Sequence, residues 1–290
     1  MTPAFISLAS HFSLLKLRVY AQLAQDTQLP SFKGSMLHGW LGHALKFVDE
    51  KAFHVLFGEH DQQQPKPYML LPGPDLKTQW RKGEIYTFEL VLFGDATNFA
   101  DRLVEACNLG HKFGLGPERC AFTTVCIGSV LNNQITPGLH PQHLIDYLPA
   151  ASTDQPIAEV ALNIETPIRL KQHGKILMQA SPSLEQWIQH ILRRWKLLSQ
   201  FWVVDDPQLY HALGQELPSI GDYEQVEHLY YENWERYSHK GKQQLPFGGL
   251  KGQTSFYGDI ARAIPWLQVG QYLHVGGKTT FGLGQFSVIA

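Results

Sequence analysis

The sequence contains little cysteine, and none of it has the spacing of a metal site or a redox motif. The 290 residues include three cysteines, Cys107, Cys120 and Cys126. An odd number without a Cys-x-x-Cys pair argues against a disulfide framework and against a structural zinc site. We therefore expect three buried thiols and no metal site.

Long apolar runs are also absent. No stretch reaches the roughly 18 consecutive apolar residues that a membrane helix needs. The first residues, Met1 to Phe5, lack a basic flank before an apolar run. Neither a membrane span nor a leader is predicted, and the expected location is the cytoplasm.

The chain has no excess of charge of one sign. Its 24 Lys and Arg residues are balanced by 26 Asp and Glu residues, which gives a net charge of −2 and a pI near 6.7. The basic total that often marks a nucleic-acid-binding protein is missing, so phosphate binding would have to come from local clusters of cations. The length and the hydrophobic content of 44% predict a globular protein with two domains.

Cofactor motifs are incomplete. Gly276 to Gly284 superficially resembles a phosphate-binding P-loop, but Tyr272 occupies the place of that motif's first glycine. Gly282 and Gly284 lack the third glycine of a dinucleotide fingerprint. Paired acids and an activated nucleophile are not apparent either, so we predict no cofactor and disfavour a small-molecule enzyme.

A small, polar segment bounded by prolines, Pro149 to Pro156, divides the sequence into domains at residues 1–150 and 157–290. Periodicity predicts strands at residues 14–23, 85–93, 121–130, 158–165, 225–237 and 285–289, and helices at residues 35–50, 98–108, 184–202 and 254–263. Ser183 is the expected cap of the 184–202 helix. The segment 53–80 reads as an irregular excursion. Each half approximates β-α-β-β-α-β, so the expected fold class is α+β with tandem ferredoxin-like (RRM-like) domains.

The two halves also share short motifs. Lys112-Phe-Gly-Leu-Gly116 is echoed by Lys278-Thr-Thr-Phe-Gly-Leu-Gly284, and each precedes an expected closing strand. A fainter echo pairs residues 32–39 with residues 250–258 in the same order. Two ordered pairs indicate duplication.

The glycine-rich segments can present bare backbone N–H groups to a phosphodiester chain, assisted by a lysine and two threonine hydroxyls. The alternative is a pair of tight turns without a ligand. The candidate ligand-binding residues of the two segments are Lys112, Gly276, Gly277, Lys278, Thr279, Thr280, Gly282 and Gly284.

The first helix carries the candidate catalytic residues. A projection at 100° per residue puts Leu37, Leu41, Ala44 and Val48 on a buried stripe, and the opposite face holds Gly39, Gly42, His43, Lys46 and Glu50. Two exposed glycines cost a helix about 1 kcal/mol each relative to alanine, which suggests close approach by a ligand. His43 and Lys46 would place a base and a cation beside a phosphate, and His38 lies at the margin. The alternative is that both histidines are ordinary solvated side chains.

Cations also cluster in the second half. Arg193, Arg194 and Lys196 lie close together on the 184–202 helix, and Arg236 lies among stackable rings in residues 234–242. This interleaving suits single-stranded or hairpin RNA, although a solvated helix face and a strand edge would look alike.

Three motifs in order resemble the CRISPR-associated endoribonucleases that process precursor CRISPR RNA, members of the RAMP (repeat-associated mysterious protein) superfamily. Residues 29–46 are similar to the family's first-helix signature, and residues 165–171 to the opening strand of its C-terminal domain. Gly248-Gly-Leu-Lys251-Gly252 and residues 275–284 are similar to its closing glycine-rich segment, in which Lys251 is a further candidate RNA-binding residue. The motifs span nearly the whole chain.

The resemblance implies tandem ferredoxin-like domains that bind CRISPR repeat RNA and cleave it without a metal. A ribose 2′-OH would attack the adjacent phosphate and leave a 2′,3′-cyclic phosphate. By position His43 is the first choice for the general base or acid and His38 the second, with Lys46 stabilising the phosphorane charge. Expected partners are precursor and mature guide RNA and other CRISPR-associated proteins. The rival interpretation is a non-catalytic RAMP subunit that binds guide RNA in an effector complex.

Overall fold

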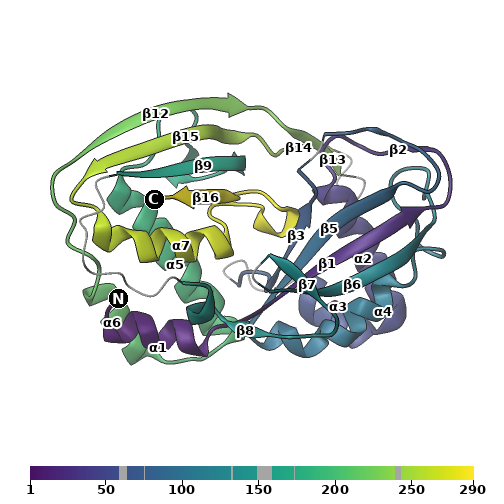
Figure 1. The fold of residues 1–290 in the computed structure, drawn as a ribbon, viewed down its shortest axis with the longest axis horizontal. Helices are drawn as coiled ribbons and strands as arrows, with labels where there is room; N and C mark the ends of the chain where they lie inside the picture. The colour runs from purple at the N-terminus through teal and green to yellow at the C-terminus, as the bar shows by residue number, and fades with distance from the viewer. Residues whose placement is uncertain (59–63, 75, 132, 149–158, 173, 239–242) are drawn as a thin grey trace.

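The computed structural model describes residues 1–290 except 59–63, 75, 132, 149–158, 173 and 239–242. The proposed boundary segment, residues 149–156, lies outside the described residues. Figure 1 shows two sheets side by side, each with its own layer of helices.

Each half folds around one antiparallel sheet. The first has the order β3-β5-β1-β6-β7, formed by β3 (Tyr68–Pro72), β5 (Ile85–Phe93), β1 (Ser13–Leu23), β6 (Phe122–Leu131) and β7 (Gln134–Thr136), with β8 (Gln142–His143) beside β1. The second has the order β12-β15-β9-β16, formed by β12 (Tyr223–Glu232), β15 (Gly249–Gly258), β9 (Glu159–Ile168) and β16 (Phe286–Ile289). When the four main strands of each half are numbered along the chain, both sheets read 2-3-1-4. This is the ferredoxin-like arrangement, and the predicted fold class is confirmed.

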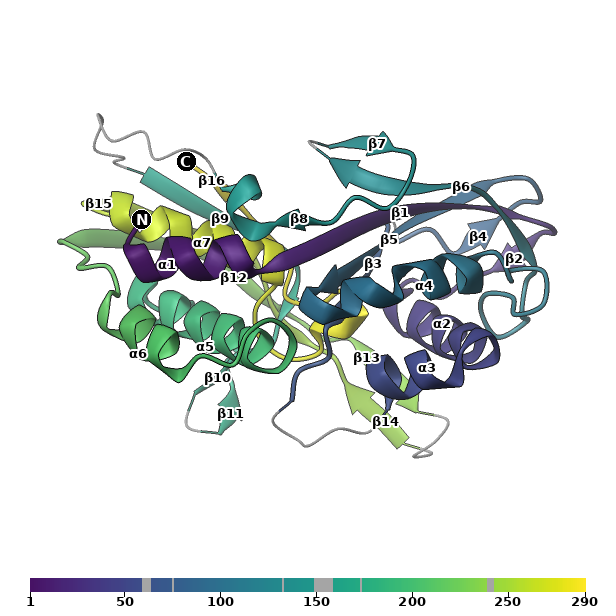
Figure 2. The ribbon, with the colours of Figure 1, turned by 90° about the horizontal axis from the view of Figure 1, so that it is seen from below.

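Helices cover one face of each sheet. The first sheet lies on α2 (Gly34–Val48), α3 (Glu50–Phe57) and α4 (Ala100–Cys107), and the second on α5 (Leu184–Trp202) and α7 (Ile264–Leu273) (Figure 2). In β1, Leu17, Val19 and Ala21 are buried, whereas Arg18 and Tyr20 between them are only partly buried. This alternation is typical of a strand with one covered and one open face.

Helix α5 forms as its sequence predicts. The Ser183 hydroxyl accepts a hydrogen bond from the Gln186 backbone N–H at 3.3 Å, and the Gln186 side-chain oxygen accepts one from the Ser183 N–H at 3.0 Å. This capping box confirms the expected cap. Trp187, Ile191 and Trp195 follow at intervals of four residues and are buried.

The chain begins with a helix that its local pattern did not reveal. α1 (Pro3–His11) contributes Phe5 to the C-terminal core, where its ring lies 5.1 Å from the rings of both Trp195 and Trp266. Strand β1 then leads from α1 into the first sheet (Figure 2). The N-terminal helix thus packs against the C-terminal domain, although the strand that follows it belongs to the N-terminal domain.

The helix predicted at residues 254–263 is wrong. Gly249–Gly258 is β15, which pairs with β12 on one side and β9 on the other, and the helix of this region begins at Ile264. Pairing with the strands on both sides stabilises the extended conformation of a central strand, and these partners cannot be identified from the local sequence. The fainter echo also fails, because residues 32–39 lead into α2 while residues 250–258 lie within a strand.

Two smaller expectations also need correction. Residues 53–80 are not an irregular excursion, because they contain most of α3 and the buried strand β3. Cys107 and Cys120 are buried, but Cys126 is exposed. Cys126 pairs with Tyr20 of β1, so both lie on the open face of the first sheet.

Candidate nucleic-acid interface

The second glycine-rich loop, residues 276–284, lies at the junction of the two domains. A Cβ atom on Gly34 of α2 would lie 2.0 Å from the Phe281 carbonyl oxygen, and one on Gly282 would lie 2.7 Å from the Leu70 oxygen of β3. Thr279, Phe281 and Leu283 are buried. The loop of the C-terminal domain therefore packs directly against the N-terminal domain.

Most glycines of this loop have structural reasons to be glycine. Gly276, Gly282 and Gly284 have φ angles of +91°, +85° and +78°, a region that side chains rarely adopt. A Cβ on Gly284 would also lie 2.1 Å from the Val275 oxygen. For these three glycines and for the buried Thr279, the geometry supports the tight-turn alternative. Gly277 and Lys278 are exposed and Thr280 is half-buried, so these residues can meet a ligand.

A buried histidine holds the loop. His274 has a φ of +57°, and its Nδ1 lies 3.2 Å from the Leu283 carbonyl oxygen. Burial lowers the pKa of His274 to about 3, although the hydrogen bond to Leu283 raises it in part. The ring is therefore neutral at pH 7 and acts as a structural donor to the loop.

Gly34 and Gly39 on α2 provide a matched test of this junction. We expect Gly34→Ala to lower the free energy of unfolding by about 1–3 kcal/mol, because its new methyl group meets the Phe281 backbone. Nothing lies within 4 Å of a Cβ on Gly39, so Gly39→Ala should raise that free energy by about 1 kcal/mol through helix propensity. Urea denaturation measures both, and a Gly34→Ala protein as stable as the wild type would contradict the close packing.

Beside this loop lies a basic pocket of about 440 Å³. Its described lining has five cationic side chains and no carboxylate; it consists of Pro65, Arg169, Leu170, Lys171, Ile176, His190, Arg193, Arg194, Leu197, Gly276, Gly277 and Lys278. Arg193, Arg194, Gly276, Gly277 and Lys278 were predicted from the sequence to bind RNA, and the fold gathers them here. Arg169 and Lys171 were missed as binding residues, although they lie in the recognised 165–171 motif.

Arg194 connects the pocket to the core. Its Nε donates to the Leu273 oxygen at 2.6 Å, and its Nη2 is buried without a hydrogen-bond partner among the described residues. Burial lowers the pKa of Arg194 to about 10, so the guanidinium remains charged at pH 7. Burial, and then Arg193, lower the pKa of His190. The pocket thus combines cations with a histidine that is more readily neutral than usual.

The structure places the two histidines of α2 on different sides of the helix. His43 and Lys46 are exposed, and Gly39 faces open space. His38 is half-buried, and its ring lies 4.6 Å from the Phe281 ring and 5.0 Å from the Phe57 ring. His38 therefore contacts the second glycine-rich loop, whereas His43 faces solvent.

The expectation that Gly42 lies on the exposed face is wrong. Gly42 is buried, and a Cβ there would lie 3.2 Å from the Phe57 ring of α3. Because α3 was not predicted, the need for a small residue between the two helices could not be foreseen.

The first glycine-rich loop, residues 112–116, meets the other end of α2. The Lys112 ammonium lies 3.3 Å from the centroid of the Phe47 ring, and the Phe47 and Phe113 rings are 5.6 Å apart. Phe47 is 59% exposed. Helix α2 therefore contacts one glycine-rich loop near its start, at Gly34 and His38, and the other at its last turn.

An interdomain cleft of about 560 Å³ lies between the open face of the first sheet and the strands β9 and β15. Its charged lining residues are Arg18, Lys33, Glu89, Glu165 and Lys251. Arg18 binds Glu89 at 2.6 Å and Lys251 binds Glu232 at 3.3 Å. Lys251, a predicted RNA-binding residue, thus lies in a cleft of mixed charge, which is less suited to phosphate than the basic pocket. Arg236 lies in β13 (Glu235–Ser238), which pairs with β14 (Gln243–Pro246).

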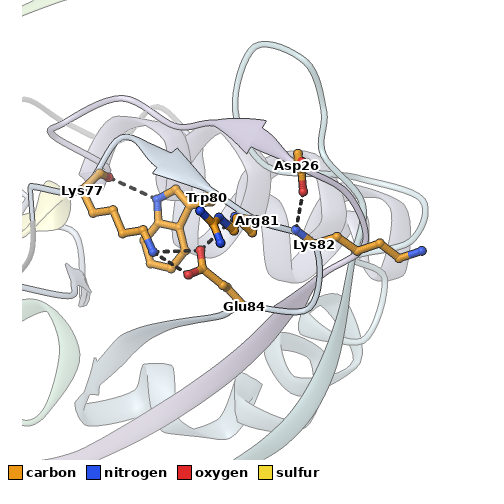
Figure 3. Close-up of polar contacts among 6 residues, drawn as sticks. All are labelled: Asp26, Lys77, Trp80, Arg81, Lys82 and Glu84. Carbon is orange, nitrogen blue, oxygen red and sulfur yellow. Dashed lines mark hydrogen bonds and ion pairs between the residues drawn. The ribbon is translucent and has the colours of Figure 1, made fainter.

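A third cavity, of about 500 Å³, lies at the corner beside residues 77–84. Figure 3 shows Lys77 lying over the Trp80 ring and paired with Glu84 at 2.8 Å, and Lys82 pointing away from the cluster. The Glu84 pairing lowers the positive field of this corner, so we assign no anion site to it. Its Arg81 and Lys82 are exposed and suit control substitutions.

Two features are absent from the described part of the chain. It contains no group of three or more His, Cys, Asp and Glu side chains placed to hold a metal ion. None of its helices is both long and apolar enough to cross a bilayer.

Solved structures share the fold over nearly the whole chain. A Cas6 product complex has a TM-score of 0.61 at 16% identity and covers 95% of this chain and 99% of its own. A Thermus thermophilus Cas6 has a TM-score of 0.57 at 15% identity, with 96% and 99% covered. A partial Cas6-RT-Cas1–Cas2 complex has a TM-score of 0.64 at 13% identity, and the match covers 97% of this chain but 46% of that one. This chain thus spans less than half of the longer chain. No curated protein matches it.

Two ferredoxin-like domains in tandem are the fold that the resemblance to RAMP proteins implies. Residues 12–144 match a family model described as an N-terminal domain. Residues 162–286 match the model of the CRISPR-associated endoribonuclease Cas6. The C-terminal domain is therefore similar to the Cas6 endoribonucleases, and the expected resemblance to CRISPR-associated endoribonucleases that process precursor CRISPR RNA is confirmed.

Proposed function

We propose that this protein binds CRISPR repeat RNA and cleaves it without a metal, producing guide RNA. One observation carries the proposal: helix α2 contacts both glycine-rich loops and presents His43 and Lys46 on an exposed face. The match of residues 162–286 to the Cas6 model supports the substrate class, as does the likeness to a Cas6 product complex. This activity is expected in the cytoplasm, where precursor transcripts are made.

The proposed reaction needs a base, an acid and a charge stabiliser. A neutral histidine removes the proton of the ribose 2′-OH, whose oxygen attacks the adjacent phosphorus. A cation such as Lys46 stabilises the phosphorane. The 5′-oxygen of the next nucleotide leaves and takes a proton from water, so the products are a 2′,3′-cyclic phosphate and a 5′-OH, and no metal takes part.

His43 is the proposed catalytic histidine. Five residues of helix separate His38 from His43 by about 140° around the axis and about 7.5 Å along it, so the two are not directed at one phosphate. His43 is exposed and shares its face with Lys46. His38 is packed by aromatic rings, and we propose that it positions the second glycine-rich loop.

The basic pocket is the proposed phosphate cradle. Cations bind phosphates whether or not a histidine cleaves the RNA. The pocket therefore also suits the rival function, a non-catalytic subunit that holds guide RNA. Other CRISPR-associated proteins are proposed partners, since one similar structure is a Cas6-RT-Cas1–Cas2 complex.

The experiment that separates the two functions uses labelled repeat RNA and a scrambled RNA of equal length in EDTA. A single cut in the repeat alone, with a 2′,3′-cyclic phosphate on the 5′ fragment, is the expected result. Tight binding of the repeat without any cut would instead establish the non-catalytic subunit.

A further inference from the structure

Phe47 is an exposed aromatic ring beside the proposed catalytic residues. It lies one helical turn after His43 and directly after Lys46, and 59% of it is exposed. The first glycine-rich loop reaches it from outside the helix, with the Lys112 ammonium 3.3 Å from its centroid and Phe113 at its side. Gly39, His43, Lys46, Phe47 and Lys112 together form what we term the helix surface.

The helix surface has the chemistry that unpaired nucleotides require. Base stacking on an aromatic side chain contributes about 1–3 kcal/mol per base and tolerates any base, while neighbouring cations bind the phosphates. The Lys112 ammonium lies over the ring, and the Lys46 ammonium lies 5.6 Å from the centroid of the Phe53 ring. The Asp49 carboxylate pairs with Arg102 at 3.5 Å. The Lys112 ammonium thus places one positive charge directly at the ring.

We propose that Phe47 stacks on an unpaired base of the RNA next to the cleavage point, with Lys112 binding the phosphate of that nucleotide. The inference rests on the proposed function for the identity of the RNA. Phe47 and His43 are about 6 Å apart along the helix axis, which is less than two stacked nucleotide steps of about 3.4 Å. The stacked nucleotide thus lies within about two steps of the phosphate beside His43.

Position 47 can be tested without disturbing the core. Phe47→Leu keeps an apolar side chain and removes the ring, and Phe47→Trp enlarges the ring. Phe201, a partly exposed phenylalanine of α5, supplies the matched control Phe201→Leu. The probe is repeat RNA made non-cleavable by 2′-deoxy nucleotides, and its affinity is measured by fluorescence anisotropy. Because nothing is cut, the result does not depend on whether the protein is a nuclease.

Phe47→Leu is expected to weaken RNA binding about 5- to 30-fold, whereas Phe47→Trp and Phe201→Leu stay within about twofold of the wild type. A scan with single abasic nucleotides should then find one position at which the wild type loses affinity and Phe47→Leu does not. Unchanged affinity of Phe47→Leu would overturn the inference, and so would equal losses for Leu and Trp, because a base can stack on the larger ring of tryptophan.

Discussion

His43→Ala is expected to slow cleavage of repeat RNA by about 10²- to 10⁴-fold, the usual contribution of a general base. Its affinity for non-cleavable RNA should stay within about threefold. The separation follows from the exposed position of His43 on α2, where alanine is a better helix former than histidine and no core contact is lost. Single-turnover kinetics with excess enzyme measures the chemical step without product release.

Two further histidine variants serve as a comparison and a control for His43→Ala. His38→Ala removes a ring that packs against Phe281 and Phe57, so it should lower thermal stability and weaken RNA binding more than it slows the chemical step. His228→Ala, at an exposed position of β12, should change neither. Cleavage at an unchanged rate by His43→Ala, together with a large loss for His38→Ala, would move the catalytic role to the junction with the second glycine-rich loop.

Removing two charges from the basic pocket is expected to weaken RNA binding about 10- to 100-fold at low salt. The pair Arg193→Gln with Lys278→Gln keeps most of each side-chain stem and takes two of the five cations from a lining that contains no carboxylate. If each cation binds one phosphate of single-stranded RNA, the slope of log affinity against log salt should fall by about 1.4.

The control pair is Arg81→Gln with Lys82→Gln, which removes the same charges at the corner drawn in Figure 3. It should lower RNA affinity only through the change in net charge, and the slope of log affinity against log salt should stay nearly unchanged. Equal effects of the two pairs would show that the pocket attracts RNA only through net charge and does not contact its phosphates.

The fold class followed from local signals. The 3.6-residue period of apolar residues and the Ser183 capping box predict α5, and the alternation of apolar and polar residues predicts β1. Both patterns lie within one short segment of the sequence. β15 was misread because its place between β12 and β9 depends on strands distant in sequence. The contacts of α1 with the C-terminal core are likewise non-local.

The candidate site was predictable in part for the same reason. Local motifs marked His43, Lys46 and the cations of α5, but their grouping is tertiary. Gly42 was placed on the wrong face because α3 was not predicted, and Phe47 was missed because Lys112 reaches it from a loop 65 positions away. The glycines of the second loop indicated a backbone with positive φ angles or a close neighbour. The sequence could not show that the N-terminal domain, and not RNA, fills the space beside Gly282.

The most direct measurement compares two repeat RNAs in EDTA, one all-ribose and one with a single 2′-deoxy nucleotide on the 5′ side of the cut. The proposed mechanism predicts that the wild-type protein cuts the first at one position and leaves the second intact, while it binds both with equal affinity. Cleavage of the deoxy RNA at the same position, or binding of both RNAs with no cut in either, would contradict it.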